Sequence, residues 1–578
     1  MRISPYFSAA FLAVALTFGG KAWTQEPEVV KPDLPKKIFA HYMGCYPVGA
    51  GATHHIRSWD PPHTRYDSEK EEFRRGGKWR NWPLVPTGPR LGGVESADLE
   101  IRRALRGGID GFAVDAWAGG DNAKKTLDYL FTAAEACGYP FEITICLDPT
   151  CLSKEPDRLT AVVEAIKYVL DRHGESPNLA RRDGKPLIFG YLSGILAASH
   201  AANVLNGTKG WENRNAYRSE EVRSHPEGWK VMFSLYDEIE RRLGRKLYFH
   251  ICIGVFFNGI NEGKPGDLKE AAAFIARRFP AVGEFLADGD YHDEISKIIR
   301  AQGAEWCEPI HYQYLNFAGR YWMPKGTEML RKRWERAREN GATLIQFSTW
   351  NDYTEMTNLA PSYNTNYAVL DLNRYFIDWW KSGRPPQPEK DKVYLFHRKY
   401  PDGAPVYPFK AINPGKNGVI EVVTILTEPA TVRLPGRKTE YKAPVGLHVE
   451  QFELTPGRVV AEVLRDGKVI LTLESPEPVT DRPYREDLGL VGFSTEFAKH
   501  WKADFGDTPP FYASEYGDID NDGLPNWFEM YWFGEFLNWG TATVAIPGED
   551  PNRDGKTNLE HYLGQTDPTR TIKVGPTP

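Results

Sequence analysis

The amino-acid sequence predicts an α/β protein built on a (β/α)8 barrel, followed by a β-sandwich and a short C-terminal segment. Short apolar runs alternate with stretches of helical spacing, and eight such strand–helix pairs fill about 350 residues. Several runs end in acids, histidines or aromatic residues, which is where barrel enzymes carry their functional side chains. This many repeats favours a closed barrel over an open doubly wound sheet.

Length and composition limit the possible classes of protein. The chain has 578 residues, too many for one ordinary core, so several domains are expected. Hydrophobic residues make up 41% and charged residues 26%, a globular composition. The net charge of −6 gives no reason to expect nucleic acid as a partner. Large cores account for most of the 17 tryptophans, although exposed rings can also stack on sugars.

The N-terminus resembles an export signal over residues 1–24. Arg2 is followed by an apolar stretch over 7–18, with cleavage expected near residues 22–24. The stretch is too short to span a membrane, so no transmembrane segment is expected in the mature chain, although an uncleaved anchor is the alternative. We expect a periplasmic, cell-surface or secreted protein. The six cysteines permit disulfides, whose pairing stays open, and Cys146 and Cys252 are expected to be buried.

The barrel is expected over residues 36–384. Its strands are predicted at 38–43, 109–115, 141–148, 186–192, 246–252, 282–287, 305–312 and 343–350. Its helices are predicted at 97–106, 122–137, 157–173, 226–243, 268–278, 293–302, 327–340 and 369–381. Two connections, 44–96 and about 193–225, are long, and such loops usually form walls or lids of a site.

The last predicted strand ends in two carboxylates. In the stretch TLIQFSTWNDYTEM, strand alternation directs Gln346, Ser348, Trp350 and Asp352 into the barrel, with Asp352 at its carboxyl end. Glu355 would point away unless the chain bends after Asp352. A pair of acids in a cleft is what glycoside hydrolysis requires, one to protonate the leaving oxygen and one to activate water or attack. The simpler interpretation is a pair of solvated loop charges.

Other strand ends bring further polar and aromatic residues to the same mouth. Together they are the mixture that a polyhydroxylated sugar needs, whereas singly each has a simpler interpretation, such as a hydrogen-bonded core histidine or an aspartate that caps a turn. The candidates for substrate binding are His41, Tyr42, Asp110, Asp115, Trp117, Asp148, His250, Glu284, His311, Trp350, Asn351 and Tyr353.

Three motifs resemble glycoside hydrolase family 71, the α-1,3-glucanases. They are FAHYM at 39–43, GIDGFA at 108–113 and TWNDYTE at 349–355, and the likeness extends from about residue 37 to about 480. The resemblance implies a barrel followed by a β-sandwich, and endo-acting hydrolysis of α-1,3-glucan with inversion. By position, Asp352 and Glu355 match the essential acid pair, and Asp110 matches a further acid.

The chain also departs from that family. Thr354-Glu355-Met356 stands where the family usually has Gly-Glu-Ser, Asp115 stands where it tends to have Asn, and the 44–96 connection is longer. Family 99, the retaining endo-α-mannosidases, has a similar Trp-Asn-acid-x-x-Glu motif with Glu in place of Asp352. Two alternatives therefore stay open: a family 99-like enzyme, and a catalytically inactive barrel that binds carbohydrate or acts as a scaffold.

The C-terminal part divides into two segments. Short alternating strands over 393–485 predict a β-sandwich that packs on the barrel or binds carbohydrate. Residues 505–578 carry two loops with calcium-binding spacing, and Ca²⁺ is the only cofactor expected. The predicted ligands are Asp518, Asp520, Asp522, Asn526 and Glu529 in the first loop, and Asp550, Asn552, Asp554 and Asn558 in the second. The second loop has His561 where the bidentate acid is expected. Such tails suggest a surface or assembly partner.

Overall fold

The computed structural model describes a defined set of residues, all within one compact unit, Leu34–Pro578. They are 34–44, 64–67, 72–75, 81, 83–84, 93–116, 121–149, 158–191, 193–206, 228–253, 265–286, 291–315, 320–402, 410–411, 413, 415, 417–437, 439–479, 489–507, 522–525, 528, 546–564, 566 and 568. The predicted signal peptide (1–24), Trp117 and most of the first predicted calcium loop lie outside them.

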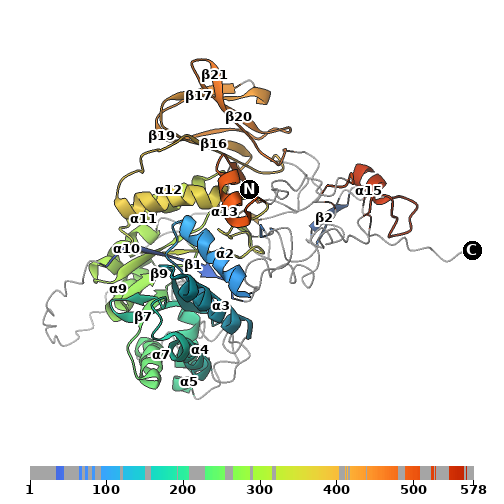
Figure 1. Ribbon diagram of the computed structural model, residues 1–578. Helices are drawn as coiled ribbons and strands as arrows, with labels where there is room; N and C mark the ends of the chain where they lie inside the picture. The colour runs from blue at the N-terminus through green and yellow to red at the C-terminus, as the bar shows by residue number, and fades with distance from the viewer. Residues whose placement is uncertain are drawn as a thin grey trace, which may run out of the picture. The chain divides into compact units, whose positions relative to one another are not determined.

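Eight parallel strands close into a barrel, which confirms the fold class predicted from the alternating pattern (Figure 1). In order around the barrel they are β5 (Glu142–Leu147), β4 (Gly111–Ala116), β1 (Lys37–Tyr42), β13 (Leu344–Phe347), β10 (Glu305–Ile310), β9 (Ala281–Gly283), β8 (Tyr248–Cys252) and β7 (Lys185–Gly190). Strand β5 pairs with β7 and so completes the ring. Closure leaves the parallel sheet without a free edge.

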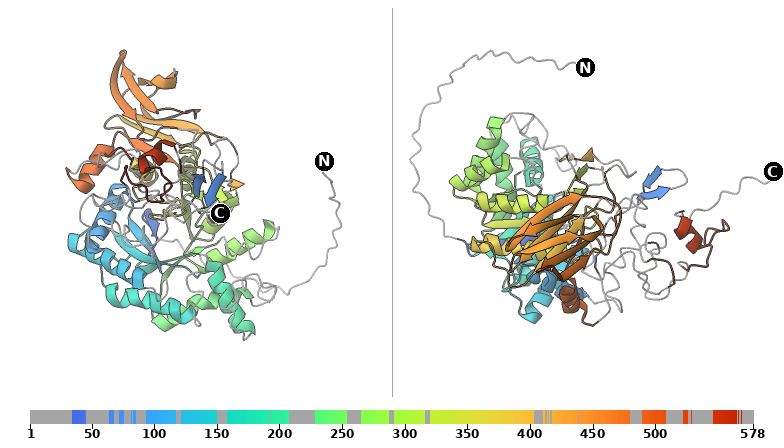
Figure 2. Two further views of the ribbon diagram at one scale, coloured as in Figure 1. Left: turned by 90° about the vertical axis from the view of Figure 1, so that its right-hand side faces the viewer. Right: turned by 90° about the horizontal axis from the view of Figure 1, so that it is seen from above.

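Helices pack around these strands (Figures 1 and 2). They are α2 (Gly93–Arg106), α3 (Asp121–Cys137), α4 (Arg158–His173), α5 (Ser193–Asn206), α7 (Gly228–Leu243), α9 (Pro265–Arg278), α10 (Tyr291–Ala301), α11 (Glu328–Glu339) and α12 (Ala368–Ser382). The expectation of an irregular connection from residue 193 is wrong at its start, because α5 occupies it. Its Ala- and Leu-rich sequence favours a helix. The other long connection contains a hairpin of β2 (Thr64–Asp67) and β3 (Glu72–Arg75).

The two faces of a barrel strand meet different cores. On β1, Ile38, Ala40 and Tyr42 join the large hydrophobic cluster that the helices cover. Phe39 belongs to a second cluster, and its ring centroid lies 5.3 Å from that of Phe189 on β7, across the interior. Alternation along the strand therefore decides which side chains can line the barrel.

Two four-stranded antiparallel sheets follow α12. One contains, in sheet order, β19 (Gly446–Glu453), β16 (Val419–Leu426), β14 (Lys392–His397) and β22 (Val491–Ser494). The other contains β18 (Thr439–Ala443), β17 (Ala430–Leu434), β20 (Val460–Arg465) and β21 (Lys468–Glu474). Both sheets contribute to one hydrophobic cluster, for example through Val422 and Val432. Strand β22 lies beyond the expected boundary at 485, because it pairs with β14 rather than with a sequence neighbour.

A buried carboxylate joins the first of these sheets to the barrel. Glu421 on β16 accepts hydrogen bonds from the hydroxyl and the backbone N–H of Thr327, the latter at 2.8 Å. Thr327 immediately precedes α11, where a negative charge interacts favourably with the helix dipole. Gln451 on β19 donates to the same carboxylate at 2.6 Å. The sheet therefore contributes a stabilising group to a barrel helix.

A second buried carboxylate holds α13 (Phe497–Phe505) against α2 (Figure 1). Asp504 accepts hydrogen bonds from Arg103 Nε at 2.6 Å, from Tyr367 Oη at 2.7 Å and from Arg106. Burial alone would raise the pKa of Asp504, but the positive charges of Arg103 and Arg106 and the hydrogen bonds lower it below its usual value. The carboxylate therefore stays charged and paired.

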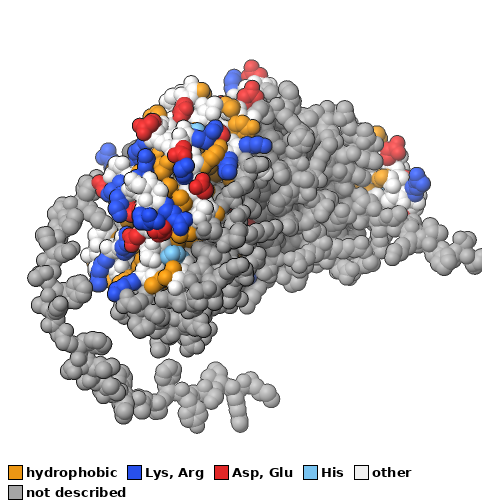
Figure 3. Space-filling view, turned by 90° about the horizontal axis from the view of Figure 1, so that it is seen from below, with side chains coloured by type: hydrophobic (Ala, Val, Ile, Leu, Met, Phe, Trp, Pro, Cys, Tyr) orange, Lys and Arg blue, Asp and Glu red, His pale blue; other side chains and the backbone are white. Residues whose placement is uncertain are grey.

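Within the described residues, no helix combines the length and the apolar character that crossing a bilayer requires. On the face shown in Figure 3, acidic and basic side chains are interspersed over the described part.

We expect Asp504→Asn to lower the free energy of unfolding by about 3–5 kcal/mol, because it leaves the buried Arg103 guanidinium without its counter-charge. Urea unfolding at pH 7 measures the change. The folded pKa of Asp504 lies below the unfolded value of about 3.9, so the carboxylate stabilises the fold above about pH 4 and loses that effect as the pH falls through the folded pKa.

The difference between wild type and variant should therefore shrink below about pH 4. Asp378→Asn is the matched control, because its pair with Arg374 is solvent-exposed, and it should change stability by less than about 0.5 kcal/mol. Equal effects of the two substitutions would contradict the role of Asp504 as the buried counter-charge of Arg103.

Candidate active site

The loop after β13 folds into a compact unit at the carboxyl end of the barrel. Strand β13 ends at Phe347, three residues before the end that the sequence pattern predicts. Thr349 N donates to Thr357 O at 3.0 Å, and Leu359 N donates back to Thr349 O at 2.9 Å. These bonds close the acid loop, defined as residues 348–360, on itself.

Asp352 produces the bend that the acid pair requires. Its Oδ1 accepts hydrogen bonds from Thr354 N at 3.0 Å, Thr354 Oγ1 at 2.7 Å and Glu355 N at 3.0 Å. An aspartate that accepts from backbone groups two and three residues further on forms a tight turn. Glu355 follows the turn, half-buried, and its carbonyl accepts from Leu315 N of β11 (Tyr314–Leu315) at 3.0 Å.

The acid loop is also fastened to the end of β1. Trp350 N donates to His41 O at 2.7 Å, which continues the pairing of β1 with β13. Met43 N donates to Asn351 Oδ1 at 2.7 Å, and Asn351 Nδ2 donates to Met43 O at 3.4 Å. Asn351 thus binds main chain rather than lining an open site, which differs from its predicted substrate-binding role.

Tyr191, directly after β7, interacts with groups from several strand ends. Burial raises its pKa well above the usual value, and the negative charges of Asp148 and Glu355 add to the effect. Its ring centroid lies 4.6 Å from that of Phe285 and 6.4 Å from that of His41. The interactions of this one phenol therefore bring the ends of β1, β5, β9 and the acid loop into one neighbourhood.

Asp115 and Asp148 lie at the carboxyl ends of two neighbouring barrel strands. Both are buried, at the ends of β4 and β5. Burial raises the pKa of the Cys146 thiol well above its usual value, and the charges of Asp115 and Asp148 raise it further. Both carboxylates therefore lie close to Cys146 inside the barrel, on the same side as the acid loop.

Two histidines of the interior are neutral. Burial lowers the pKa of His41 to about 3 and that of His250 to about 3. His41 packs edge-on against Phe285, with 4.8 Å between ring centroids. His250 lies deeper, 4.9 Å from Phe189 by ring centroids. Neutral imidazoles can donate or accept a hydrogen bond but supply no positive charge.

Glu284 and His311 complete the group at the carboxyl end. Glu284 follows β9, and Cys252 Sγ lies 3.9 Å from its Oε2. His311 follows β10 and stacks on Trp322 with ring centroids 5.2 Å apart. Trp322 ends β12 (Arg320–Trp322), and its ring centroid lies 5.5 Å from that of Tyr314. The rings of His311, Tyr314 and Trp322 therefore form an aromatic cluster beside the candidate site.

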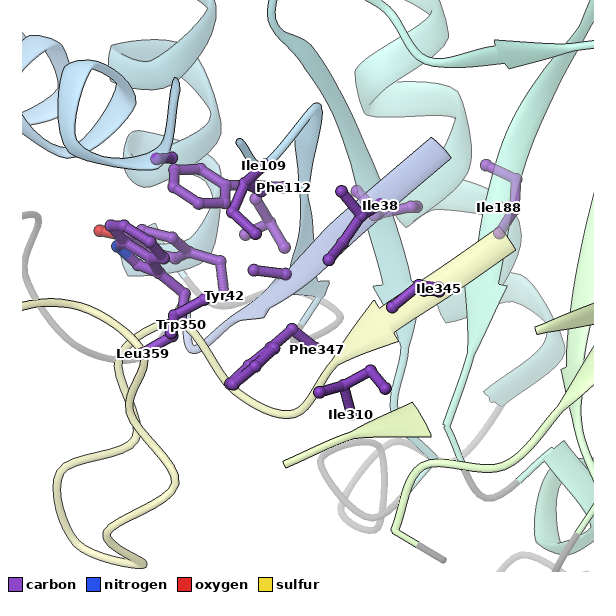
Figure 4. Packing of buried hydrophobic residues seen from close by; sticks show 14 of the residues in the cluster. Ile38, Tyr42, Ile109, Phe112, Ile188, Ile310, Ile345, Phe347, Trp350 and Leu359 are labelled. Atoms are coloured by element: carbon purple, nitrogen blue, oxygen red, sulfur yellow. The ribbon is translucent and has the colours of Figure 1, made fainter. Parts of the chain in front are cut away.

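Three predicted site residues face the helices instead of the barrel interior. Tyr42 and Trp350 belong to the large hydrophobic cluster and contact Phe112, with ring centroids 5.0 and 5.1 Å away (Figure 4). Tyr353 belongs to the same cluster, near the charges of Glu100 and Arg103. The predicted alternation fails at Trp350 because the strand ends at Phe347. These three side chains are buried in that cluster, so the structure does not bring them together with the other predicted substrate-binding residues.

Asp110 lies at the opposite end of the barrel. It precedes β4, its Oδ2 accepts from Ile38 N at 2.8 Å, and Lys381 Nζ donates to its Oδ1 at 2.6 Å. Lys381 is in the last turn of α12, and helices of this fold end where strands begin. Asp110 therefore stabilises the amino-terminal end, and its prediction as a site residue is wrong.

The sequence reasoning missed Tyr191, Phe285, Tyr314 and Trp322. Tyr191 had a usable signal, because it follows a predicted apolar strand at the position where barrel enzymes carry functional residues. Phe285 adjoins the predicted Glu284. Tyr314 and Trp322 lie in the hairpin formed by β11 and β12, which no sequence pattern indicates.

The described residues contain no group of three or more His, Cys, Asp or Glu side chains arranged to hold a metal ion. In the second calcium-like loop, Asp550 accepts from the N–H groups of Asp554 and Gly555 at 3.1 and 2.9 Å. His561 Nε2 lies 3.2 Å from Asp554 Oδ1, where the bidentate acid would stand. The side chains of this loop therefore bind one another.

Cys137, Cys146, Cys252 and Cys307 are free thiols.

Comparison with known proteins gives one match to a family. Residues 299–488 match the model of glycosyl hydrolase family 71, a range that contains the whole acid loop. None of the curated proteins matches the chain.

Solved structures give distant likenesses. The family 99 endo-α-mannosidase of Bacteroides thetaiotaomicron is 15% identical over 60% of this chain and 97% of its own, with a TM-score of 0.38. A β-glucuronidase of Bacteroides uniformis is 12% identical over 70% of this chain and 46% of its own, with a TM-score of 0.36. Likenesses this distant do not bear on what the chain does.

We expect the ring signals of His41 and His250 to stay unchanged between pH 5 and 8, because both pKa values lie at about 3. The unfolded value is about 6.5, so these residues contribute full stability above that pH and lose it as the pH falls towards 3. NMR titration of the imidazole signals, assigned with His41→Gln and His250→Gln, measures this. A midpoint between pH 5 and 8 for either ring would contradict the buried, neutral assignment.

Proposed function

We propose that the chain is a glycoside hydrolase that cleaves an α-linked polysaccharide, α-1,3-glucan by preference, with inversion of configuration. One observation carries the proposal. The turn at Asp352 bends the chain so that Asp352 and Glu355 both belong to a loop at the carboxyl end of a closed barrel. That loop lies within the residues that match a glycoside hydrolase family. Two carboxylates at this end of the fold are the groups that glycosidic hydrolysis uses.

The surroundings of the two carboxylates suggest different roles. Asp352 Oδ1 accepts three hydrogen bonds, and an ionised carboxylate is an acceptor only. This supports Asp352 as the base that activates water. Glu355 is more exposed than Asp352. A leaving oxygen can reach the more exposed carboxyl group more readily, which supports Glu355 as the acid that protonates it.

The remaining groups around the mouth suit a sugar. Asp115, Asp148 and Glu284 offer hydrogen-bond acceptors, and His41 and His311 offer imidazoles. Tyr191, Tyr314 and Trp322 supply ring faces that can pack on a pyranose. The proposed reaction needs no metal ion.

A retaining α-mannosidase is the second candidate. The motif Trp350-Asn351-Asp352-Tyr353-Thr354-Glu355 resembles that of family 99 except for Asp at 352. The shorter Asp leaves more room for a water above the anomeric carbon, which favours inversion. An inactive, carbohydrate-binding barrel is the third candidate and would bind a glycan without releasing reducing ends.

The tail and the N-terminus carry two further proposals. Calcium binds the first loop, through Asp518, Asp520, Asp522, Asn526 and Glu529, because five oxygen side chains and Gly523 match the required spacing. Calorimetric titration of the full chain with Ca²⁺ tests this, and an unchanged heat in Asp518→Ala would contradict it. The protein is exported after cleavage near residue 24, which N-terminal sequencing of the exported protein would test.

Asp352→Asn and Glu355→Gln should each lower kcat by a factor of about 10² or more, since general acid and base catalysis each contribute about that much. Reducing-sugar release from a panel of α-linked glucans and mannans measures turnover. Glu389→Gln, an exposed carboxylate beyond α12, is the matched control and should keep wild-type kcat. Near wild-type turnover in either site variant would remove that residue from the mechanism.

Inversion should appear in the first product. Proton NMR of an α-1,3-glucan digest should show the β-anomer before mutarotation, because water attacks from the face opposite the leaving group. An initial α-anomer would exclude the inverting mechanism and support the retaining candidate. Glycan binding without either product would support the inactive barrel.

A further inference from the structure

Glu100 on α2 is a buried carboxylate outside the candidate site. It is 2% exposed, and its Oε2 accepts a hydrogen bond from the indole N–H of Trp350, which is fully buried. Burying a carboxylate is costly, and a buried indole N–H also needs a partner. Each group therefore satisfies the other.

Trp350 is part of the acid loop by its main chain as well as by its ring. Its backbone N–H donates to His41 O at 2.7 Å, and its backbone carbonyl accepts from Ala360 N at 2.8 Å. Asp352 and the turn to Glu355 follow two residues later. Any rotation or displacement of Trp350 is therefore passed directly to the two carboxylates.

Packing of the rings alone does not fix the orientation of the Trp350 indole, and the hydrogen bond to Glu100 does. Figure 4 shows Trp350 beside Tyr42 and Phe112, whose rings supply apolar contact. Of the polar side chains nearby, the carboxylate of Glu100 is the one that accepts a hydrogen bond from the indole N–H. Apolar contacts are non-directional, whereas a hydrogen bond has a preferred angle.

The Glu100 carboxyl group lies among charged neighbours on α2 and α13. Arg103, one turn further along α2, donates to Asp504 and, at 2.9 Å, to Leu84 O. Burial raises the pKa of Glu100, and the charge of Arg103 and the bond from Trp350 act against that rise, whereas Asp504 adds to it. Glu100 thus has a fixed position within a buried network that reaches from α13 to the acid loop.

We infer that Glu100 is a positioning residue for the reaction: it fixes the Trp350 indole and thereby sets the geometry of Asp352 and Glu355. The inference rests on the proposed hydrolase function. Glu100 itself touches neither carboxylate. Loss of the bond should displace the acid loop by a fraction of an ångström to about 1 Å, and misplacement on that scale costs about 10²-fold in rate.

The test compares four single variants of the full chain and one double variant, Glu100→Ala with Trp350→Phe. Glu100→Ala removes the acceptor, and Glu100→Gln keeps an acceptor oxygen of the same reach. Trp350→Phe removes the donor and keeps an aromatic ring. Glu135→Ala, an exposed carboxylate on the neighbouring helix α3, is the matched control.

Glu100→Ala should lower kcat about 10²-fold with KM within about threefold, because orientation is lost and not substrate contact. Glu100→Gln should restore kcat to within about fivefold of wild type, and Glu135→Ala should leave it unchanged. Trp350→Phe should lower kcat by a similar factor to Glu100→Ala, and the double variant should be no worse than either, since both remove one interaction. Full activity in Glu100→Ala, or equal damage by Gln and Ala, would overturn the inference.

A readout without substrate separates this inference from the proposed function. The amide proton signals of Thr354 and Glu355, which donate to Asp352 in the turn, should move in Glu100→Ala and return in Glu100→Gln. Failure of wild type to cleave any glycan would contradict the proposed function, and the amide signals would still decide the positioning. Unmoved amide signals in Glu100→Ala would overturn the positioning role of Glu100.

If Glu100→Ala does not fold, Trp350→Phe provides the test. Wild-type kcat together with unmoved amide signals in Trp350→Phe would overturn the inference.

Discussion

The pairing of β1 with both β4 and β13 is the interaction on which the remaining structure depends. It joins the first barrel strand to the last, which are about 300 residues apart in sequence, and so closes the sheet. Closure fixes an inside and an outside for every strand, because side chains alternate. It also places the backbone of His41 and Met43 beside Trp350 and Asn351, where the same ladder of hydrogen bonds continues into the acid loop.

The acid loop shows how an irregular segment can be buried without loss of hydrogen bonds. Its polar groups satisfy one another: Asp352 accepts from Thr354 and Glu355, and Asp352 N donates to Thr349 Oγ1 at 2.9 Å. Asn81, from the long connection after β1, donates its backbone N–H to Tyr353 O at 3.2 Å and its side-chain amide to Ser362 Oγ at 2.9 Å. A loop held from both sides in this way presents its carboxylates in a defined geometry, which general acid and base catalysis requires.

Buried carboxylates also connect the barrel to the parts of the chain that follow it. Glu421 binds the start of α11, and Asp504 binds Arg103 on α2. Asp371 on α12 accepts from His500 Nε2 at 3.0 Å and from Lys392 Nζ at 3.1 Å. Each side chain is buried and accepts several hydrogen bonds, so removing one would leave buried donors without a partner. The sheets and α13 are therefore structural partners of the barrel helices.

The sequence by itself determined the barrel, because the alternation of apolar runs and helical stretches follows from the local periods of strands and helices. It also indicated that Asp352 follows a strand that ends at the mouth of such a barrel, whereas the turn that keeps Glu355 in the same loop comes from the structure. The strand ends at β5, β9 and β10 were recognisable for the same reason, and Asp148, Glu284 and His311 lie there.

Only the tertiary structure decided which way side chains point once a strand stops. Strand alternation predicted Trp350 inside, but β13 ends at Phe347, and the free energy of burying an indole against Phe112 and Glu100 determines its direction. Asp110 matched a site motif, yet Lys381 and Ile38 hold it at the opposite end of the barrel. Glu100 carries no signal in the sequence at all. Its partner is 250 residues away, and that contact exists only because β1 and β13 are neighbours in the closed sheet.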